Sequence, residues 1–122
     1  MRYTVDQMPV EMELGEIRTR AFDAGGVYTR HIALPAGTDF TPLLVGLADD
    51  RCQCPHWGQV LEGSITVRYA DGTEETCRAG DVYYWPAGHT GWTVDGVVFL
   101  ESSPTEEILP VLEHLSRQLT SA

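Results

Sequence analysis

The chain has 122 residues and a formal net charge of −10, and 43% of its residues are hydrophobic. This length predicts a single domain over residues 1–122, and the apolar content is enough for a core rather than a disordered chain. The acidic balance excludes nucleic acid and anionic membrane surfaces as partners, because both attract basic proteins.

The cysteine count and the amino terminus bear on the compartment. Three cysteines are an awkward number for a disulfide framework. Residues 1–16 contain no apolar signal core, and no apolar run approaches the roughly 20 residues of a membrane span. We therefore expect a cytoplasmic protein, in which cysteines bind metal, catalyse or pack in the core.

Glycine and proline punctuate residues 25–96 at short intervals, and the stretches between them are rich in Val, Ile, Tyr, Trp and Thr. This pattern predicts many short strands joined by tight turns, as in a β-sandwich or barrel. Residues 65–69 alternate apolar and polar side chains before Asp71-Gly72, a dipeptide suited to a two-residue hairpin turn. In chain order, we expect strands at 27–34, 43–47, 65–69 and 82–85, and a hairpin around residues 95–96.

Only the carboxyl-terminal segment, about residues 104–119, has helical features. Ser103 and Glu106 have the spacing of a capping box, with Pro104 in the first turn, and leucines recur beyond them at helical intervals. Pro110 predicts a kink or the start of a second helix. The sequence thus predicts an all-β barrel over about residues 27–102, followed by a short helix.

Residues 49–63, DDRCQCPHWGQVLEG, contain two of the three cysteines and one of the four histidines. In a straight strand Cys52, Cys54 and His56 face the same side at steps of roughly 6.6 Å. Two of them can hold one ion, and a turn or bulge at Pro55 would allow all three. A Cys52–Cys54 disulfide would be strained, so a redox pair is the weakest reading, and burial of both thiols as core residues is the other alternative.

The stretch HWGQVLEGSITVRYADGTEETCRAGDVYYWPAGH resembles the conserved core of a small single-domain cupin. Cupins are double-stranded β-helix, or jelly-roll, barrels with the motifs G-x5-H-x-H-x3,4-E-x6-G and G-x5-P-x-G-x2-H-x3-N. Here VLEG matches the end of the first motif, and Gly80, Pro86 and Gly88 match the start of the second. The resemblance covers about residues 39–101. It implies the fold and leaves the function open, because cupins include isomerases, dioxygenases, decarboxylases, storage proteins and regulators.

The metal-binding positions depart from this family pattern. His56 stands where a cupin has its ligand glutamate, Cys52 and Asp50 stand where it has paired histidines, and Cys54 falls in the spacer. His89 comes two positions before the usual histidine. The chain resembles a bacterial cupin subgroup with Cys-x-Cys-Pro-His in place of the usual ligands.

The predicted metal ligands are His56, His89, Cys54 and Cys52. His56 and His89 rank first, because the resemblance places both in motif segments that line the barrel mouth. Thiolates and imidazoles in a tetrahedral set favour zinc over the iron or manganese of standard cupins. Three protein ligands would leave one position open for chemistry, whereas four would make a closed structural site.

Aromatic residues near these donors are candidates for the pocket wall, namely Tyr84, Trp92 and Trp57; packing in the core or in a dimer contact is their alternative role. Strand alternation places Tyr84 and Trp85 on opposite faces and Trp57 opposite His56. The other ionisable candidates are expected to be packing or solvated residues: His31, His114, Cys77, Glu62 and Glu101.

Two functions stay open at this level. One is a metal-dependent enzyme of isomerase, lyase or oxygenase type that acts on a small organic molecule. The alternative is a non-catalytic cupin that binds a small molecule or has a sensory role, with any metal structural. Small cupins commonly dimerise, and exposed strand edges favour pairing, so we expect a homodimer with a small-molecule ligand.

Overall fold

The computed structural model describes residues 1–120, which form eight strands, three 3-10 helices and one α-helix. The strands are β1 (Val10–Leu14), β2 (Ile17–Ala24), β3 (Val27–Leu34), β4 (His56–Arg68), β5 (Glu74–Arg78), β6 (Val82–Trp85), β7 (Thr90–Trp92) and β8 (Val97–Pro104). The helices are η1 (Val5–Gln7), η2 (Thr41–Leu44), η3 (Ala48–Asp50) and α1 (Thr105–Thr120).

Most predicted elements are present, with three differences. The hairpin expected around residues 95–96 is wrong, because the strands on either side of it do not pair with each other: β7 pairs with β4, and β8 pairs with β3 and β4. The strand expected at residues 43–47 is wrong, because Thr41–Leu44 form the 3-10 helix η2, which has Pro42 in its first turn. In addition, β1 and β2 precede the predicted barrel core. These two strands carry many charged and exposed side chains, so their sequence lacks the apolar alternation that marks a strand.

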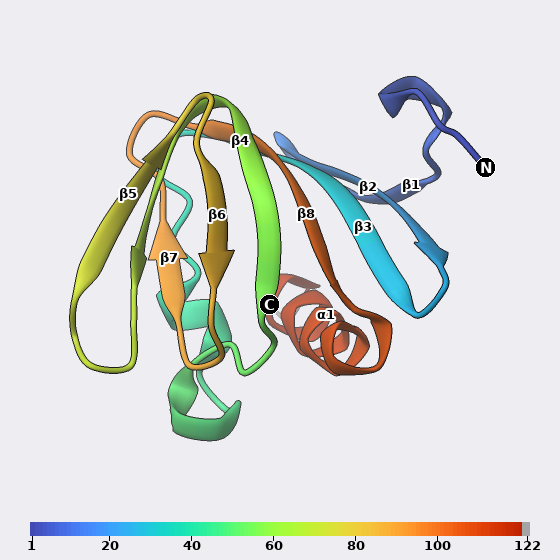
Figure 1. Cartoon of the computed structure of the whole chain (residues 1–122). Coiled ribbons are helices and arrows are strands. Elements are labelled where there is room, and N and C mark those ends of the chain that lie inside the picture. Colours follow the sequence, from blue (N-terminus) through green and yellow to red (C-terminus); the bar gives the residue numbers. More distant parts are fainter. Residues whose placement is uncertain (121–122) are drawn as a thin grey trace.

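The strands form a jelly-roll-like β-sandwich whose sheet does not close completely (Figure 1). The larger layer has the antiparallel order β1-β2-β3-β8-β4-β6. The smaller layer has the order β5-β4-β7. The first half of β4 therefore belongs to one layer and its second half to the other, which places the interior between the two halves.

Two glycines of β4 lie where any side chain would clash with a neighbouring strand. Gly63 has φ +74°, and a Cβ there would lie 2.1 Å from the Gly96 carbonyl oxygen. A Cβ at Gly58 would lie 2.4 Å from the Tyr83 hydroxyl. No side chain other than hydrogen fits at either position, so Gly63 permits the strand bend and Gly58 permits Tyr83 to cross the layer.

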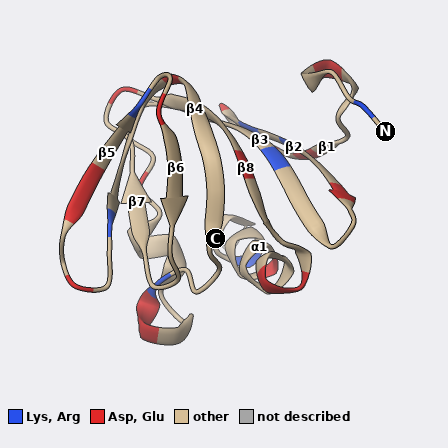
Figure 2. Ribbon diagram, in the orientation of Figure 1, with Lys and Arg blue, Asp and Glu red and all other residues tan. Residues whose placement is uncertain are grey.

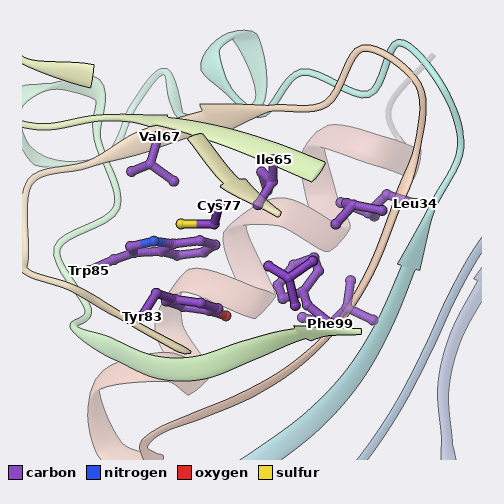
Figure 3. Packing of buried hydrophobic residues seen from close by; sticks show 10 residues of the cluster. Leu34, Ile65, Val67, Cys77, Tyr83, Trp85 and Phe99 are labelled. Atoms are coloured by element: carbon purple, nitrogen blue, oxygen red, sulfur yellow. The ribbon is translucent and has the colours of Figure 1, made fainter. Parts of the chain in front are cut away.

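The main core lies between the layers and contains aromatic side chains from β6 and β8 (Figure 3). Tyr83 and Trp85 are stacked, with ring centroids 3.8 Å apart and an interplanar angle of 17°. Phe99 packs against both rings from β8. Because residues two apart share a face of a strand, this inward position of Tyr83 and Trp85 turns Tyr84 outward.

Helix α1 lies beside β8 at one end of the sandwich (Figure 1). Its buried side chains Ile108, Val111 and Leu115 form a second apolar cluster with Leu44 of η2 and with the two cysteines Cys52 and Cys54. Helix α1 continues through Pro110 to Thr120, so no second helix begins at the proline. Proline has no backbone N–H to donate within the helix. Because the side chain of Pro110 is exposed, this hydrogen bond is missing on the outer side of α1 and not next to the core.

The acidic and basic residues gather mainly on the outer strands, loops and helices, whereas β6 and the first part of β4, residues 56–61, contain no Asp, Glu, Lys or Arg (Figure 2). In the part of the chain described, no helix has both the length and the apolar character needed to cross a bilayer.

Candidate metal centre

Cys52, His56 and His89 come together in the interior. Each offers one ligand atom, and the three atoms lie within 4.8 Å of one another. The Cys52 Sγ is 3.4 Å from His56 Nε2, and the two imidazole centroids are 4.9 Å apart. All three residues are 5% exposed.

Backbone pairing explains how residues far apart in the sequence meet here. Cys52 and His89 form an isolated antiparallel bridge, in which the Cys52 amide donates to the His89 carbonyl at 2.9 Å. His56 opens β4 and lies opposite Trp85 of β6. The three donors therefore sit on well-ordered backbone rather than on a free loop.

Hydrogen bonds orient the two imidazole rings. His89 Nδ1 lies 2.7 Å from the Pro86 carbonyl oxygen; because a carbonyl can only accept, Nδ1 carries the proton and Nε2 keeps its lone pair. His56 Nδ1 lies 2.7 Å from Ser103 Oγ and 3.6 Å from Glu101 Oε2. With its proton on Nδ1, His56 also presents the lone pair of Nε2 beside the Cys52 thiol, as metal-binding histidines do.

Burial controls the protonation of the three donors. Desolvation lowers the pKa of His56 to about 3, with a further contribution from the charge of Arg30. Desolvation and the neighbouring His56 lower the pKa of His89 to about 4. Both rings are thus neutral at pH 7. Burial raises the pKa of Cys52 to about 12, so the thiol keeps its proton until a cation displaces it.

Glu101 is a buried member of this site, so the expectation of a solvated carboxylate is wrong. It is 4% exposed, and Tyr83 donates a hydrogen bond to it at 2.9 Å. Desolvation raises the pKa of Glu101, against the lowering effect of Arg30. The alternation of β8 could have indicated this, because Val97, Phe99, Glu101 and Ser103 share the inward face.

Cys54 lies apart from the three-donor group, although it is also buried. Its Sγ contacts the Pro55 carbonyl at 3.4 Å, and its side chain packs in the cluster with α1. Burial raises the pKa of Cys54 to about 12. The chain bends at Cys54 before β4 begins, and the ligand atoms of Cys52 and His56 come together without that of Cys54.

The three aromatic residues predicted at the pocket wall do not line the cavity. Trp57 and Tyr84 are 50% and 51% exposed and contact each other on the outer face, with centroids 5.2 Å apart. Trp92 is half-buried, and the Arg68 guanidinium lies over its ring. That prediction is wrong because alternation defines two faces of a strand without indicating which one is interior.

A cavity of about 60 Å³ adjoins the three donors. Its polar wall includes Arg30, Thr90 and Glu101 besides the donors themselves. The rest is apolar and comes from both layers, from residues 40–44 and from α1: Ile32, Phe40, Leu44, Ile65, Val67, Trp85, Gly91, Phe99, Ile108, Val111, Leu112 and Leu115. A water needs at least about 10–15 Å³ of such space, so the cavity has room for a ligand of a few non-hydrogen atoms.

The other residues expected to have packing or solvated roles fit those expectations. Cys77 is buried in the main core, and all three cysteines are free. His114 packs on α1, where its Nε2 lies 2.9 Å from the Val45 carbonyl. His31 is half-buried on β3, and Glu62 is exposed.

No protein-family model and no curated protein matches the sequence. Solved structures do share its fold. An RmlC-like cupin from Shewanella frigidimarina is 17% identical, with a TM-score of 0.62 over 88% of this chain and 93% of that chain.

Two metalloproteins have a similar fold. Oxalate decarboxylase from Bacillus subtilis, described with Mn(II) centres, is 16% identical, with a TM-score of 0.60 over 84% of this chain and 28% of that chain. The iron protein HppE, described with Fe(II), is 9% identical, with a TM-score of 0.60 over 84% of this chain and 59% of that chain. Identities this low establish a shared fold and leave the chemistry to the residues of this chain.

Proposed function

We propose that this chain, which has the cupin fold, binds one zinc ion through Cys52, His56 and His89 and acts on a small organic molecule held in the adjoining cavity. The observation that carries the proposal is the convergence of three buried donor atoms within 4.8 Å. Neutral imidazoles and a thiolate suit zinc better than the hard, oxygen-preferring ions. Two solved structures with a similar fold are described with manganese or iron, which supports a metal in this fold.

Three donors favour a catalytic rather than a structural ion, because tetrahedral zinc with three protein ligands has a fourth position for water or substrate. A zinc ion there would polarise a carbonyl group or lower the pKa of a bound water. The chain contributes the rest: the apolar wall excludes water, and Ser103 orients His56. Since zinc does not change its oxidation state, we propose an isomerase or lyase type of reaction.

The alternative is a non-catalytic cupin with a structural metal. It would gain support if Cys54 completed a closed set of four ligands, because such a site has no position for a substrate. The observation against it is that, among the described residues, the group of ligand atoms that lie within 4.8 Å of one another comprises Cys52, His56 and His89 and does not include Cys54.

The deciding experiment is elemental analysis of protein purified without a histidine tag. We expect about one zinc equivalent in the parent, since three such ligands hold zinc tightly. Cys52→Ser, His56→Ala and His89→Ala should each lose most of it. Cys77→Ser is the matched control, because Cys77 is equally buried but lies in the main core.

The outcomes separate the alternatives. A parent that neither contains zinc nor takes it up on dialysis would refute the proposal. Retention of zinc in Cys54→Ser would support the three-ligand site, whereas its loss would favour the closed structural one.

We also propose a homodimer that forms through the outer face of β4 and β6. Strand β6 pairs with β4 alone among the described strands, so one of its edges is open. Val82 is 80% exposed, and Trp57 and Tyr84 lie beside it on the same face. Two chains that each carry a net charge of −10 approach with least repulsion through an uncharged apolar surface such as this one.

A cytoplasmic location is part of the same proposal. All three cysteines are free and buried, and free thiols persist in reducing compartments.

A further inference from the structure

One buried cation of the cavity wall has no part in holding a metal. Arg30 of β3 is 8% exposed and points inward with Ile32 and Leu34. Buried arginines are rare unless an acid pairs with them. Arg30 has such a partner in Glu11 of β1, yet it also lines the cavity that adjoins the three donors.

The contacts of Arg30 leave part of its guanidinium unused. Its Nε and its Nη2 both contact one oxygen, Glu11 Oε1, at 2.9 Å. The second oxygen of Glu11 accepts from Tyr28. An arginine has five N–H donors in a planar fork, so this one retains binding capacity.

Arg30 faces the same interior as the three donors. Arg30 lies opposite Glu101 in the register of β3 and β8, with both side chains on the inner face. The described residues show no ion pair between them. Arg30 nevertheless lines the same cavity as Cys52, His56 and His89. Arg30 is therefore near enough to contact a ligand that lies beside the three donors.

The charges of the loaded site allow an anion to enter. Arg30 and Glu11 cancel each other. A divalent ion balances the Cys52 thiolate together with Glu101, even when Glu101 is ionised. With a divalent ion bound, the site would be neutral overall. A negative ligand would then lie near two positive groups, the metal ion and the Arg30 guanidinium, and would experience no net repulsion.

We propose that the cavity binds a small monocarboxylate whose carboxylate group lies between the metal-capable donors and Arg30. This inference rests on the proposed zinc site. A guanidinium fork matches a planar carboxylate, and the cavity of about 60 Å³ holds a molecule of the size of acetate but not an aromatic acid. The apolar wall from Ile65, Val67 and Phe99 receives the hydrocarbon part of the ligand.

The test uses the full chain loaded with Co²⁺, whose bond to a thiolate gives an absorption band that reports the ion and its surroundings. Acetate is titrated against acetamide, which has the same shape without the charge, and against benzoate, which is too large. We expect acetate to change the Co²⁺ spectrum with saturation, and acetamide and benzoate to leave it unchanged at equal concentration.

The role of Arg30 is tested in the double variant Arg30→Gln/Glu11→Gln, which removes both buried charges together and leaves hydrogen-bonding groups in their place. We expect its acetate affinity to fall about tenfold or more, as for the loss of a hydrogen bond to a charged group. Arg18→Gln is the matched control, because Arg18 is exposed on β2 and pairs with Glu13; its acetate affinity should equal that of the parent.

The outcomes separate this inference from the zinc proposal. Absence of the thiolate band in the parent refutes the metal site and this inference with it. A normal band that responds equally to acetate and acetamide, or to neither, overturns the carboxylate proposal alone. An unchanged acetate affinity in the double variant also overturns it, and the unliganded Co²⁺ spectrum of that variant shows that its site has folded.

Discussion

At the scale of single residues, Ser103 determines how His56 presents its lone pair. Ser103 is 1% exposed and lies 2.7 Å from His56 Nδ1. Partners of this kind fix the tautomer and the direction of a ligating ring, and their loss weakens metal binding about 10–100-fold. Glu101, 3.6 Å from the same nitrogen, is a second such partner.

We therefore expect Ser103→Ala to weaken zinc binding at least about tenfold while the fold persists. Competition with a chromophoric chelator measures the affinity, and circular dichroism checks the fold. The matched control is Ser102→Ala, because the adjacent Ser102 hydrogen-bonds Thr29 and points away from the site. Equal zinc affinities in the two variants would contradict this role of Ser103.

At the scale of elements, α1 contributes one wall of the cavity. Its apolar face packs against η2, Cys52 and Cys54. His114 connects the helix to the loop after η2 through its contact with the Val45 carbonyl. The helix therefore covers the site as well as completing the second apolar cluster. A change on its inward face should alter both stability and the shape of the cavity.

Ile108→Ala should lower the free energy of unfolding by about 2–5 kcal/mol, because Ile108 is 2% exposed and its loss leaves a void. The neighbouring Leu109 is 47% exposed, so Leu109→Ala should change stability by only about 0.5 kcal/mol. Urea denaturation measures both. Similar losses in the two variants would mean that α1 does not pack as described.

Pro110 shows how tertiary packing overrides a local preference. A proline in a helix interior costs about 3 kcal/mol relative to alanine, so the sequence predicts a kink or the start of a second helix at this position. The helix instead continues, because the buried side chains on both sides of Pro110, Ile108 and Val111, hold the same apolar cluster together. Local propensity therefore predicted where α1 begins, but it did not predict that one helix continues past Pro110 to Thr120.

At the scale of the whole molecule, the exposed aromatic face predicts the oligomeric state. Tyr84→Glu should convert a dimer into a monomer, because it would bury two like charges in the proposed interface. Sedimentation velocity measures the change. Val94→Glu is the control, since Val94 is 69% exposed and lies outside β4 and β6. A parent that sediments as a monomer would contradict the proposal.

The buried histidines predict how the metal-free protein responds to acid. His56 and His89 have lowered pKa values, about 3 and about 4, whereas the unfolded chain binds protons on both below about pH 6.5. Their contribution to stability is thus complete above pH 6.5 and is lost as the pH falls, by up to about 2.7 kcal/mol per pH unit for the two together.

Glu101 opposes this trend. Its raised pKa means that its stabilising contribution is present at low pH and is lost as the pH rises through the folded value. Glu101→Gln removes that opposition, so we expect the variant to lose stability more steeply than the parent between pH 6.5 and 5. Urea denaturation of the metal-free proteins at several pH values measures the slopes. Parallel pH profiles would contradict the buried state of Glu101.

The amino-acid sequence by itself determined the all-β class, most of the strands, the carboxyl-terminal helix and the segment that holds the donors. These follow from local patterns: alternation, turn dipeptides, capping residues and the density of Cys and His. Such signals depend only on residues that are close together in the chain, so they can be recognised without knowledge of the fold.

Only the tertiary structure decided which residues meet. Strand pairing brings Cys52 beside His89, the bend before β4 leaves Cys54 outside the group of three donors, and the inward face of β8 carries Glu101 to the site. Alternation cannot distinguish the inner from the outer face of β6, so Tyr84 was assigned to the pocket in place of Trp85. The physical reason is that burial depends on which strands pair and in which register, and these contacts join residues far apart in the chain.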